Sequence, residues 1–221
     1  MNKKTKKKIR IAEAACQRYI VNQRFTIRSL AELLGMESKE IFEHFPNRRS
    51  ILEFYYEAQF LKYKDALSEI DSYDSFSLSE KIGNLALVLL DHFEEKREFV
   101  LLTYKKIIVC SPRGTEFENL MQDEIQTIVR EDQKICRSGR LLNGSLSSKA
   151  VLLHFHGLVK FWMNDSSDGK QKTMELVDRW TALAESILYT KVADKATDLA
   201  KFFIYNSPLS AIFKDKEEKN V

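Results

Sequence analysis

Apolar residues recur every three or four positions along most of the chain, which is the spacing of one face of an α-helix. The first such stretch covers residues 5–21. Thr26 is a good N-cap and Gly35 suits a helix end, so these residues bound a second helix of about two turns. A further short helix is expected at 37–44, and a long one follows at 47–70. The pattern therefore predicts a three-helix head and a connecting helix that leads out of it.

The helical spacing continues after a break rich in serine and aspartate at residues 71–77. Only seven glycines and three prolines occur, too few for the many turns of an all-β protein. We therefore expect an all-α fold with a head at 1–51, a helical body at 52–208 and a charged tail at 209–221. Because the stretch 99–110 is apolar on nearly all sides, we expect it to lie centrally. The other helices expected in the body cover residues 82–93, 117–136, 150–163, 172–189 and 192–205.

The composition is that of a soluble protein, with 30% charged and 44% hydrophobic residues in a chain of 221. Its longest apolar runs fall far short of the roughly 20 residues that span a bilayer, and no apolar signal-peptide core follows the basic N-terminus. We expect a cytoplasmic protein with no membrane partner. The spacing of Cys16, Cys110 and Cys136 fits neither a disulfide framework nor a zinc site, and it favours buried thiols over a redox-sensing pair.

The charge is unevenly distributed between the head and the body. Residues 1–51 contain twelve lysines and arginines but only five glutamates, a net charge of +7, so the remaining residues carry −4 of the chain's total of +3. A basic head on an acidic body is typical of a nucleic-acid-binding module, because phosphate neutralisation supplies most of its affinity. A solvated lysine tail is the alternative explanation for residues 3–8.

The stretch IRSLAELLGMESKEIFEHFPNR, residues 27–48, closely resembles the signature of the tetracycline-repressor (TetR) family of transcriptional regulators. Weaker similarity continues at residues 139–141, before a later helix. The resemblance implies a helix-turn-helix head, whose second helix reads the major groove of DNA. The positions that carry the match by their spacing are Ala31, Gly35, Ile41, Phe42, Phe45 and Arg48.

The resemblance also implies which side chains face double-stranded DNA. An N-cap hydroxyl and a guanidinium both suit an anion, so we expect Thr26 and Arg48 to contact phosphates. Lys39 is the best candidate for a base or phosphate contact, and the lysine-rich arm at residues 3–8 is expected to follow the DNA backbone or a minor groove. The full set of DNA-facing residues is Thr26, Arg28, Ser38, Lys39, Glu40, Phe42, Glu43, His44 and Arg48.

Two features of the recognition helix depart from the family pattern. Phe42 stands where the family usually has tyrosine, so a hydroxyl contact to phosphate is missing. Glu37, Glu40 and Glu43 place three carboxylates on a helix that must approach a polyanion. One glutamate can accept a hydrogen bond from cytosine N4, but three cost Coulomb energy. An alternative therefore stays open, in which the dimer has lost DNA binding and serves as a ligand-binding or adaptor protein.

For the body, the resemblance implies a pocket for a small-molecule effector and a homodimer in which two late helices pair with those of a second subunit. These helices would be 150–163 and 172–189, and the helix at 192–205 would cover the pocket or extend the interface. Candidate interface residues, large and apolar on an otherwise polar helix, are Trp180, Leu183, Ile187 and Leu188. Candidate pocket residues, polar or aromatic within apolar helices, are His92, Tyr104, Cys110, His154, His156, Lys160 and Trp162.

No motif in the sequence favours an enzyme, a metal or a cofactor. The glycine-rich phosphate loop, the Gly-x-Ser-x-Gly elbow and the HExxH pair are all missing, and the carboxylates are scattered over helix faces. His154 and His156 lie two residues apart and do not share a helical face, which disfavours a metal site. The sequence predicts a ligand-responsive repressor that binds a palindromic operator as a dimer, rather than a catalyst.

Overall fold

The computed structural model describes residues 1–135 and 145–189, and every regular element in these two ranges is a helix. The all-α fold expected from the sequence is therefore confirmed. The head contains α1 (Lys3–Val21), α2 (Ile27–Leu34) and α3 (Ser38–Phe42), and α4 (Arg48–Leu67) follows it. The body continues with η1 (Tyr73–Ser75), α5 (Leu78–Glu94), α6 (Arg97–Tyr104), the π-helical η2 (Lys105–Val109), α7 (Glu116–Glu131), α9 (Ser145–Asn164), η3 (Asp168–Lys170) and α10 (Gln171–Tyr189).

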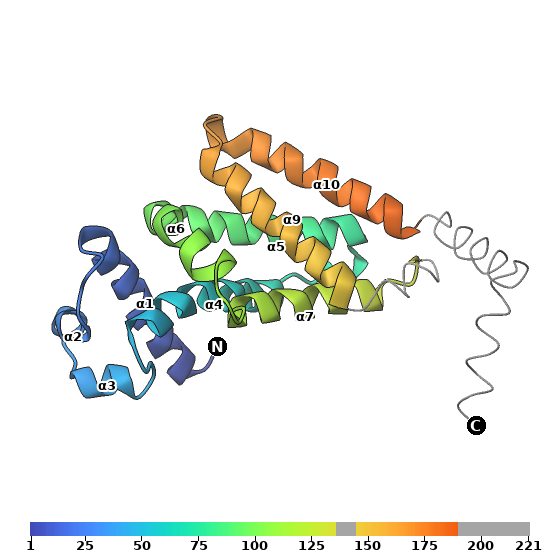
Figure 1. Cartoon of the computed structure of the whole chain (residues 1–221). Coiled ribbons are helices and arrows are strands. Elements are labelled where there is room, and N and C mark those ends of the chain that lie inside the picture. Colours follow the sequence, from blue (N-terminus) through green and yellow to red (C-terminus); the bar gives the residue numbers. More distant parts are fainter. Residues whose placement is uncertain (136–144, 190–221) are drawn as a thin grey trace, which may run out of the picture.

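The described part of the chain is elongated, with the three head helices at one end (Figure 1). Helix α4 leads from the head into the body, where it packs against α5 and α7. Helix α10 lies on α5 and α9, so that α9 and α10 form an outer pair on the body. The head and the body are thus joined through α4 and through the packing of α1 on α4 and α6.

The local caps of α2 form as expected. The Oγ1 of Thr26 accepts a hydrogen bond from the backbone N–H of Ser29 at 3.1 Å, and the Oγ of Ser29 accepts one from the Thr26 N–H at 3.2 Å. Gly35 ends the helix with φ of 64°, a left-handed conformation that glycine adopts without steric cost. These two residues fix where the chain turns from α2 towards α3.

A continuous core runs from the head into the body. On α1, Ile11, Ala15 and Cys16 are fully buried, and burial raises the pKa of the Cys16 thiol well above its usual value. The ring of Tyr19 meets the ring of Phe99 edge-on, with centroids 5.7 Å apart. Further aromatic contacts among Tyr55, Tyr56, Phe93, Phe99, Tyr104, Phe117, Phe155 and Trp162 extend this core through the body.

Several expected features of the body differ in the structure. The stretch 99–110 is not buried on all sides, since Leu101, Leu102 and Val109 are 46%, 42% and 47% exposed. Helix α6 packs against α1 and α5, and these contacts leave Leu101 and Leu102 exposed to solvent. Helix α7 ends at Glu131 rather than near 136, and α9 begins at Ser145 rather than at 150. The expected helix at 192–205, the tail at 209–221 and the similarity at 139–141 lie outside the described residues.

Candidate nucleic-acid interface and body cavity

Helices α2 and α3 form a helix-turn-helix whose inner sides are apolar. Leu30 and Ala31 of α2 and Ile41 of α3 are buried, and Phe45 closes the same core after α3. The opposite side of α3 consequently faces outward, with Lys39, Phe42 and Glu43 exposed. This arrangement leaves one side of a short helix free to meet a partner, as in helix-turn-helix proteins.

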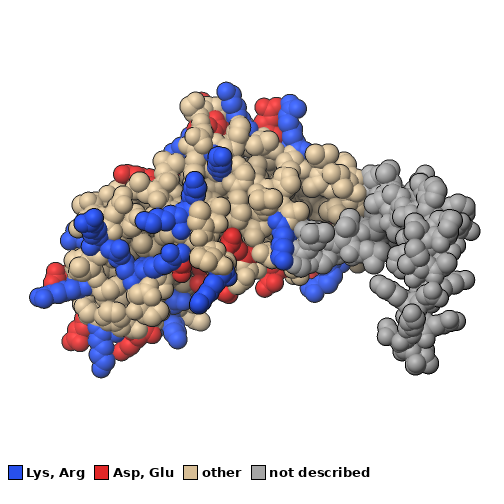
Figure 2. Space-filling view, viewed as in Figure 1, with Lys and Arg blue, Asp and Glu red and all other residues tan. Residues whose placement is uncertain are grey.

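Basic side chains cover much of the head surface around this helix. Figure 2 shows lysine and arginine gathered over the head, with a smaller number of carboxylates between them. A surface of this charge attracts a polyanion and raises its rate of association. The exposed basic residues of the head are Lys3, Lys4, Lys6, Arg10, Arg24, Arg28, Lys39 and Arg49.

The side chain of Glu40 is engaged within the head. Its Oε2 accepts a hydrogen bond from the Nζ of Lys7 on α1 at 2.9 Å, and its Oε1 accepts one from the backbone N–H of Glu37 at 3.1 Å. The bond from Lys7, followed by that from Glu37, lowers the pKa of the Glu40 carboxyl. Glu37, Glu40 and Glu43 are the three carboxylates on and beside α3. Lys7 therefore offsets the charge of Glu40, while Glu37 and Glu43 remain exposed.

Arg48 differs from Arg28 in its surroundings. The Nη1 of Arg48 donates to the backbone oxygen of Phe25 at 3.0 Å, and its guanidinium carbon lies 5.5 Å from the Phe25 ring centroid. Arg28 is 86% exposed in its side chain and contacts Glu32 on the same helix at 3.2 Å. Arg48 therefore joins the start of α4 to the start of α2, whereas the side chain of Arg28 extends into solvent.

The remaining expected DNA-facing residues lie on the same part of the head. Thr26 is exposed at the start of α2, and Ser38 is partly exposed at the start of α3. Phe42 is 53% exposed on the outward-facing side of α3. His44 is partly buried, and its Nδ1 is enclosed with no hydrogen-bond partner among the described residues. The structure thus brings all nine residues onto the helix-turn-helix and its edges.

The candidate pocket residues do not come together. Of these seven residues, only Trp162 lines the body cavity that is described in the next paragraph. Tyr104 and His156 are hydrogen-bonded at 2.8 Å elsewhere in the body, and His92 Nδ1 lies 3.3 Å from the Gln59 backbone oxygen. Cys110, His154 and Lys160 are exposed on the surface. A polar residue within an apolar helix therefore does not by itself indicate a cavity, because most of these residues contact other residues of the body or face solvent.

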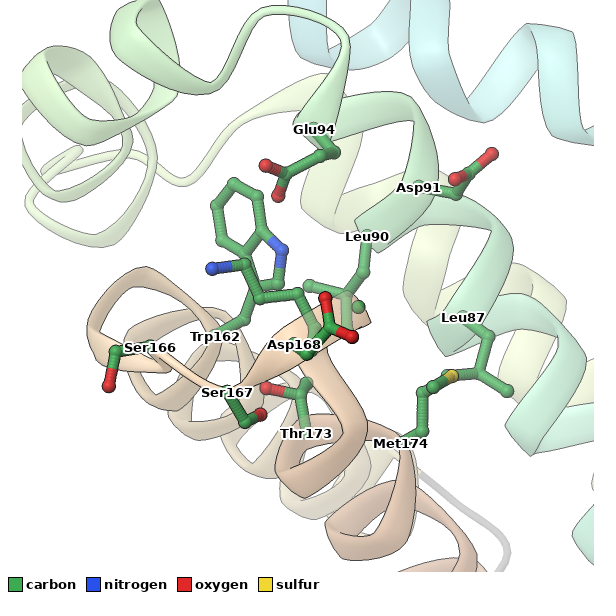
Figure 3. A pocket seen from close by; sticks show the side chains of 12 residues that line it. Leu87, Leu90, Asp91, Glu94, Trp162, Ser166, Ser167, Asp168, Thr173 and Met174 are labelled. Carbon is green, nitrogen blue, oxygen red and sulfur yellow. The ribbon is translucent and has the colours of Figure 1, made fainter.

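The cavity has a volume of about 710 Å³ and lies between α5, the end of α9 and the start of α10 (Figure 3). One feature of the sequence could have pointed to it, the polar break between two apolar helices at residues 164–169, because this loop closes one side of the cavity. The lining residues are Leu87, Leu90, Asp91, Glu94, Trp162, Ser166, Ser167, Asp168, Gly169, Lys170, Thr173 and Met174.

The outer pair α9 and α10 exposes an apolar surface. Leu183 and Ile187 are each 59% exposed, and Leu153, which was not among the expected interface residues, is 70% exposed. The imidazole of His154 stacks on the indole of Trp180 with centroids 5.6 Å apart and an interplanar angle of 18°. Trp180 and Leu188 are half-buried, so all four expected interface residues border this surface. A contiguous exposed apolar surface is a candidate for contact with another protein chain.

The described residues contain no group of three or more histidine, cysteine, aspartate or glutamate side chains placed to hold a metal ion. Nor does any helix among them combine the length and the apolarity needed to cross a membrane.

A helix-turn-helix head on an all-helical body defines the general class of this molecule. The family described as the tetracyclin repressor-like C-terminal domain matches residues 81–203, more than half of the chain. The protein therefore belongs to the TetR family, as the resemblance in the head predicted.

One solved structure is similar over most of the chain. It is a protein from Shewanella sp. PV-4 described as a TetR family transcription regulator, with a TM-score of 0.46 and 15% sequence identity over 88% of this chain and 98% of that chain. A comparison with curated protein sequences gave no significant match.

Proposed function

We propose that this protein is a DNA-binding transcriptional regulator, a ligand-responsive repressor that binds a palindromic operator as a homodimer. The observation that carries the proposal is the outward-facing side of α3 on a head rich in exposed lysine and arginine. Phosphate contacts would come from Arg28, Arg48 and the α1 lysines, and base contacts from Lys39 and its neighbours on α3.

The carboxylates of the recognition segment are compatible with this proposal. Because Lys7 pairs with Glu40 at 2.9 Å, the charge opposing DNA on α3 is smaller than the sequence alone suggests. Glu43 is exposed and free to accept from a cytosine amino group, which would make it a source of specificity. We therefore expect moderate affinity with a strong dependence on salt concentration.

The proposed dimer uses the apolar surface of α9 and α10. Exposed Leu153, Leu183 and Ile187 would be buried against the same surface of a second subunit, as a two-fold symmetric interface requires. Two heads held in this way can meet successive major grooves about 34 Å apart. An effector in the body would act by favouring a head spacing that does not fit the operator.

The joint between head and body offers a place where such a change would be transmitted. A cavity of about 220 Å³ separates Lys8 and His44 of the head from Glu57 and Glu116 of the body. The Nζ of Lys8 lies 3.8 Å from the centroid of the Phe54 ring on α4. A shift of α4 or of the start of α7 would therefore alter the contacts that orient the head.

Selection of bound duplexes from a random DNA pool by the full-length protein at about 50 mM salt tests this proposal. We expect a palindromic consensus whose half-sites are about 10 base pairs apart from centre to centre. Failure to retain any duplex above background would contradict it.

A second function deserves the same experiment, because Glu37 and Glu43 are exposed beside the recognition surface. If the protein forms a stable dimer but retains no DNA, a ligand-binding or adaptor role is favoured instead. A palindromic consensus would exclude that alternative, since it requires both DNA binding and a two-fold dimer.

A further inference from the structure

The body cavity combines an apolar floor with an acidic wall. Its volume of about 710 Å³ falls within the range of roughly 300–1,000 Å³ typical of small-molecule sites. Leu87 and Leu90 come from α5, and Met174 comes from the first turns of α10. These side chains and the edge of the buried Trp162 indole provide a surface for an apolar ligand body (Figure 3).

The charged groups of the lining are mostly negative. Asp91 and Glu94 project from α5 and Asp168 from the loop, against the single ammonium of Lys170. The Nζ of Lys170 is occupied, because it donates to the backbone oxygen of Asp165 at 2.5 Å. In Figure 3 Glu94 and Asp168 extend from opposite sides towards the space beside the Trp162 indole, while Asp91 lies at the rim.

Arg97 lies behind the indole rather than in the cavity lining. Its guanidinium carbon is 4.8 Å from the Trp162 ring centroid, and its Nη2 donates to the backbone oxygen of Met163 at 2.8 Å. The Nη1 of Arg97 is 3.5 Å from Glu94, so it offsets part of that carboxylate's charge. Asp91 and Asp168 remain as exposed carboxylates of the lining, and the cavity stays acidic.

The loop that closes the cavity is held in place by Asp165. One carboxylate oxygen of Asp165 accepts from the backbone N–H and hydroxyl of Ser167 at 2.9 and 2.6 Å. The other accepts from the backbone N–H and hydroxyl of Thr173 at 2.9 and 2.6 Å. These bonds hold the pKa of the Asp165 carboxyl well below its usual range. The cavity wall is therefore set before a ligand arrives, which lowers the ordering cost of binding.

We propose that this cavity binds a small organic cation with an apolar body. Its ammonium group would lie between Glu94 and Asp168, and its apolar part would pack against Leu87, Leu90 and Met174. The inference deepens the proposed function, since such a cation would be the effector of the repressor. An organic anion is disfavoured, because it would meet at least two unneutralised carboxylates in a partly enclosed space.

Isothermal calorimetry of the full-length protein without DNA tests the ligand class. The probes are 4-phenylbutylamine, 4-phenylbutan-1-ol and 4-phenylbutanoate, which share one apolar body and differ in charge. We expect the amine to saturate and to bind at least about ten times more tightly than the alcohol, with the carboxylate weakest. Equal or tighter binding of the alcohol or the carboxylate would overturn the proposal, as would the lack of saturable binding by all three.

Substitutions of the lining residues then test whether the amine binds in this cavity. Glu94→Gln combined with Asp168→Asn should weaken the amine at least about tenfold and leave the alcohol unchanged. Asp123→Asn, an exposed carboxylate on α7, is the matched control and should change neither. Met174→Trp should weaken both probes by filling the cavity. Unchanged amine affinity in the double variant, or in Asp168→Asn alone if the double variant does not fold, would refute this site.

The two proposals fail in different ways. Amine binding is measured without DNA, so its absence leaves a palindromic consensus from the DNA selection standing. If the amine binds but no DNA is retained, the cavity keeps its ligand and the regulator proposal fails. If both succeed, added amine should release the selected operator, and release by the amine but not by the carboxylate would link the cavity to the head.

Discussion

Arg28 and Arg48 carry the same guanidinium in different surroundings, and the surroundings decide what each substitution would change. Arg28 makes a single exposed contact with Glu32, and exposed ion pairs of this kind contribute little to stability. Arg48 bonds the carbonyl of Phe25 and lies over its ring, so it supports the head in addition to its proposed contact with DNA phosphate.

We expect Arg28→Ala to weaken DNA binding across all sequences and to reduce the salt slope by about 1, with the thermal unfolding curve unchanged. Arg179→Ala is a matched control, because Arg179 is 77% exposed on α10 and pairs with Glu175 at 2.6 Å. Titration of a labelled duplex at several salt concentrations measures both variants. Equal loss of affinity in the two would show that Arg28 has no specific role.

Arg48→Ala should lower the free energy of unfolding by about 1 to 2 kcal/mol, because it removes a charged hydrogen bond to a backbone carbonyl. It should also weaken DNA binding. Chemical denaturation of Arg48→Ala beside Arg49→Ala, whose side chain is exposed and pairs with Glu53, separates the two effects. An Arg48→Ala protein with the same free energy of unfolding as the parent would mean that the bond to Phe25 does not contribute to stability.

A glycine at the end of a helix and a glycine inside a helix differ in what a side chain at that position would cost. Gly35 has φ of 64° after α2, and an added Cβ would meet no atom within 4 Å, so only backbone strain opposes a side chain. Gly157 lies inside α9 and would also meet nothing within 4 Å, but there glycine merely weakens the helix. The same substitution therefore has opposite expected effects in the two elements.

Gly35→Ala should destabilise the protein by about 1 kcal/mol, and Gly157→Ala should stabilise it by about 0.5 to 1 kcal/mol. Thermal unfolding followed by circular dichroism compares both with the parent protein. The turn between α2 and α3 would have to be less constrained than we describe if Gly35→Ala were neutral.

The pKa values of two glutamates are shifted in opposite directions by their surroundings. Burial raises the pKa of Glu118 on α7, but hydrogen bonds from His156 and Thr115 outweigh it, and the pKa of the carboxyl is lowered. Burial raises the pKa of Glu57 on α4, and the charge of Glu116 adds to the rise while Lys8 opposes it. A carboxyl whose pKa is lowered on folding stabilises the folded state at pH values above its unfolded pKa, and this stabilisation is lost on acidification. A carboxyl whose pKa is raised on folding destabilises the folded state near neutral pH, and acid relieves this penalty.

Glu118→Gln should therefore reduce stability near neutral pH and have less effect as the pH falls below about 4. Glu57→Gln should increase stability near neutral pH, with its advantage vanishing in acid. Urea unfolding at pH 7 and at a series of lower pH values provides the measurement. Changes of the same sign in the two variants would show that their surroundings are not as described.

At the scale of the molecule, the proposed assembly depends on the surface of α9 and α10. Leu183 and Ile187 contribute little to the core of one subunit, since each is 59% exposed. Replacing them with charged residues should therefore separate subunits without unfolding them. Because one head alone loses the second half-site, DNA affinity should fall steeply along with the dimer.

Leu183→Glu combined with Ile187→Glu should convert the dimer to a monomer and weaken operator binding at least about 100-fold. Leu102→Glu on α6, where the leucine is 42% exposed, is the control and should leave the dimer intact. Light scattering after gel filtration reports the mass, and duplex titration the affinity. A double variant that stays dimeric would move the interface elsewhere.

The sequence alone determined the helical class, the cap at Thr26, the turn at Gly35 and the family. These properties depend on residues near one another in the chain, where helical spacing and capping act locally. It also supplied the candidate DNA-facing residues, whose role stays a prediction, because a helix-turn-helix places such residues within about 20 consecutive positions.

Only the tertiary structure decided which charged residues pair and which residues line the cavity. The pairing of Lys7 with Glu40 joins residues 33 positions apart, and the bond from Arg48 to Phe25 spans 23. The cavity is built from residues 87–94 and 162–174, brought together by the packing of α10 on α5. Periodicity reveals which face of a helix is apolar but not which other helix it meets, because that choice depends on contacts between distant segments.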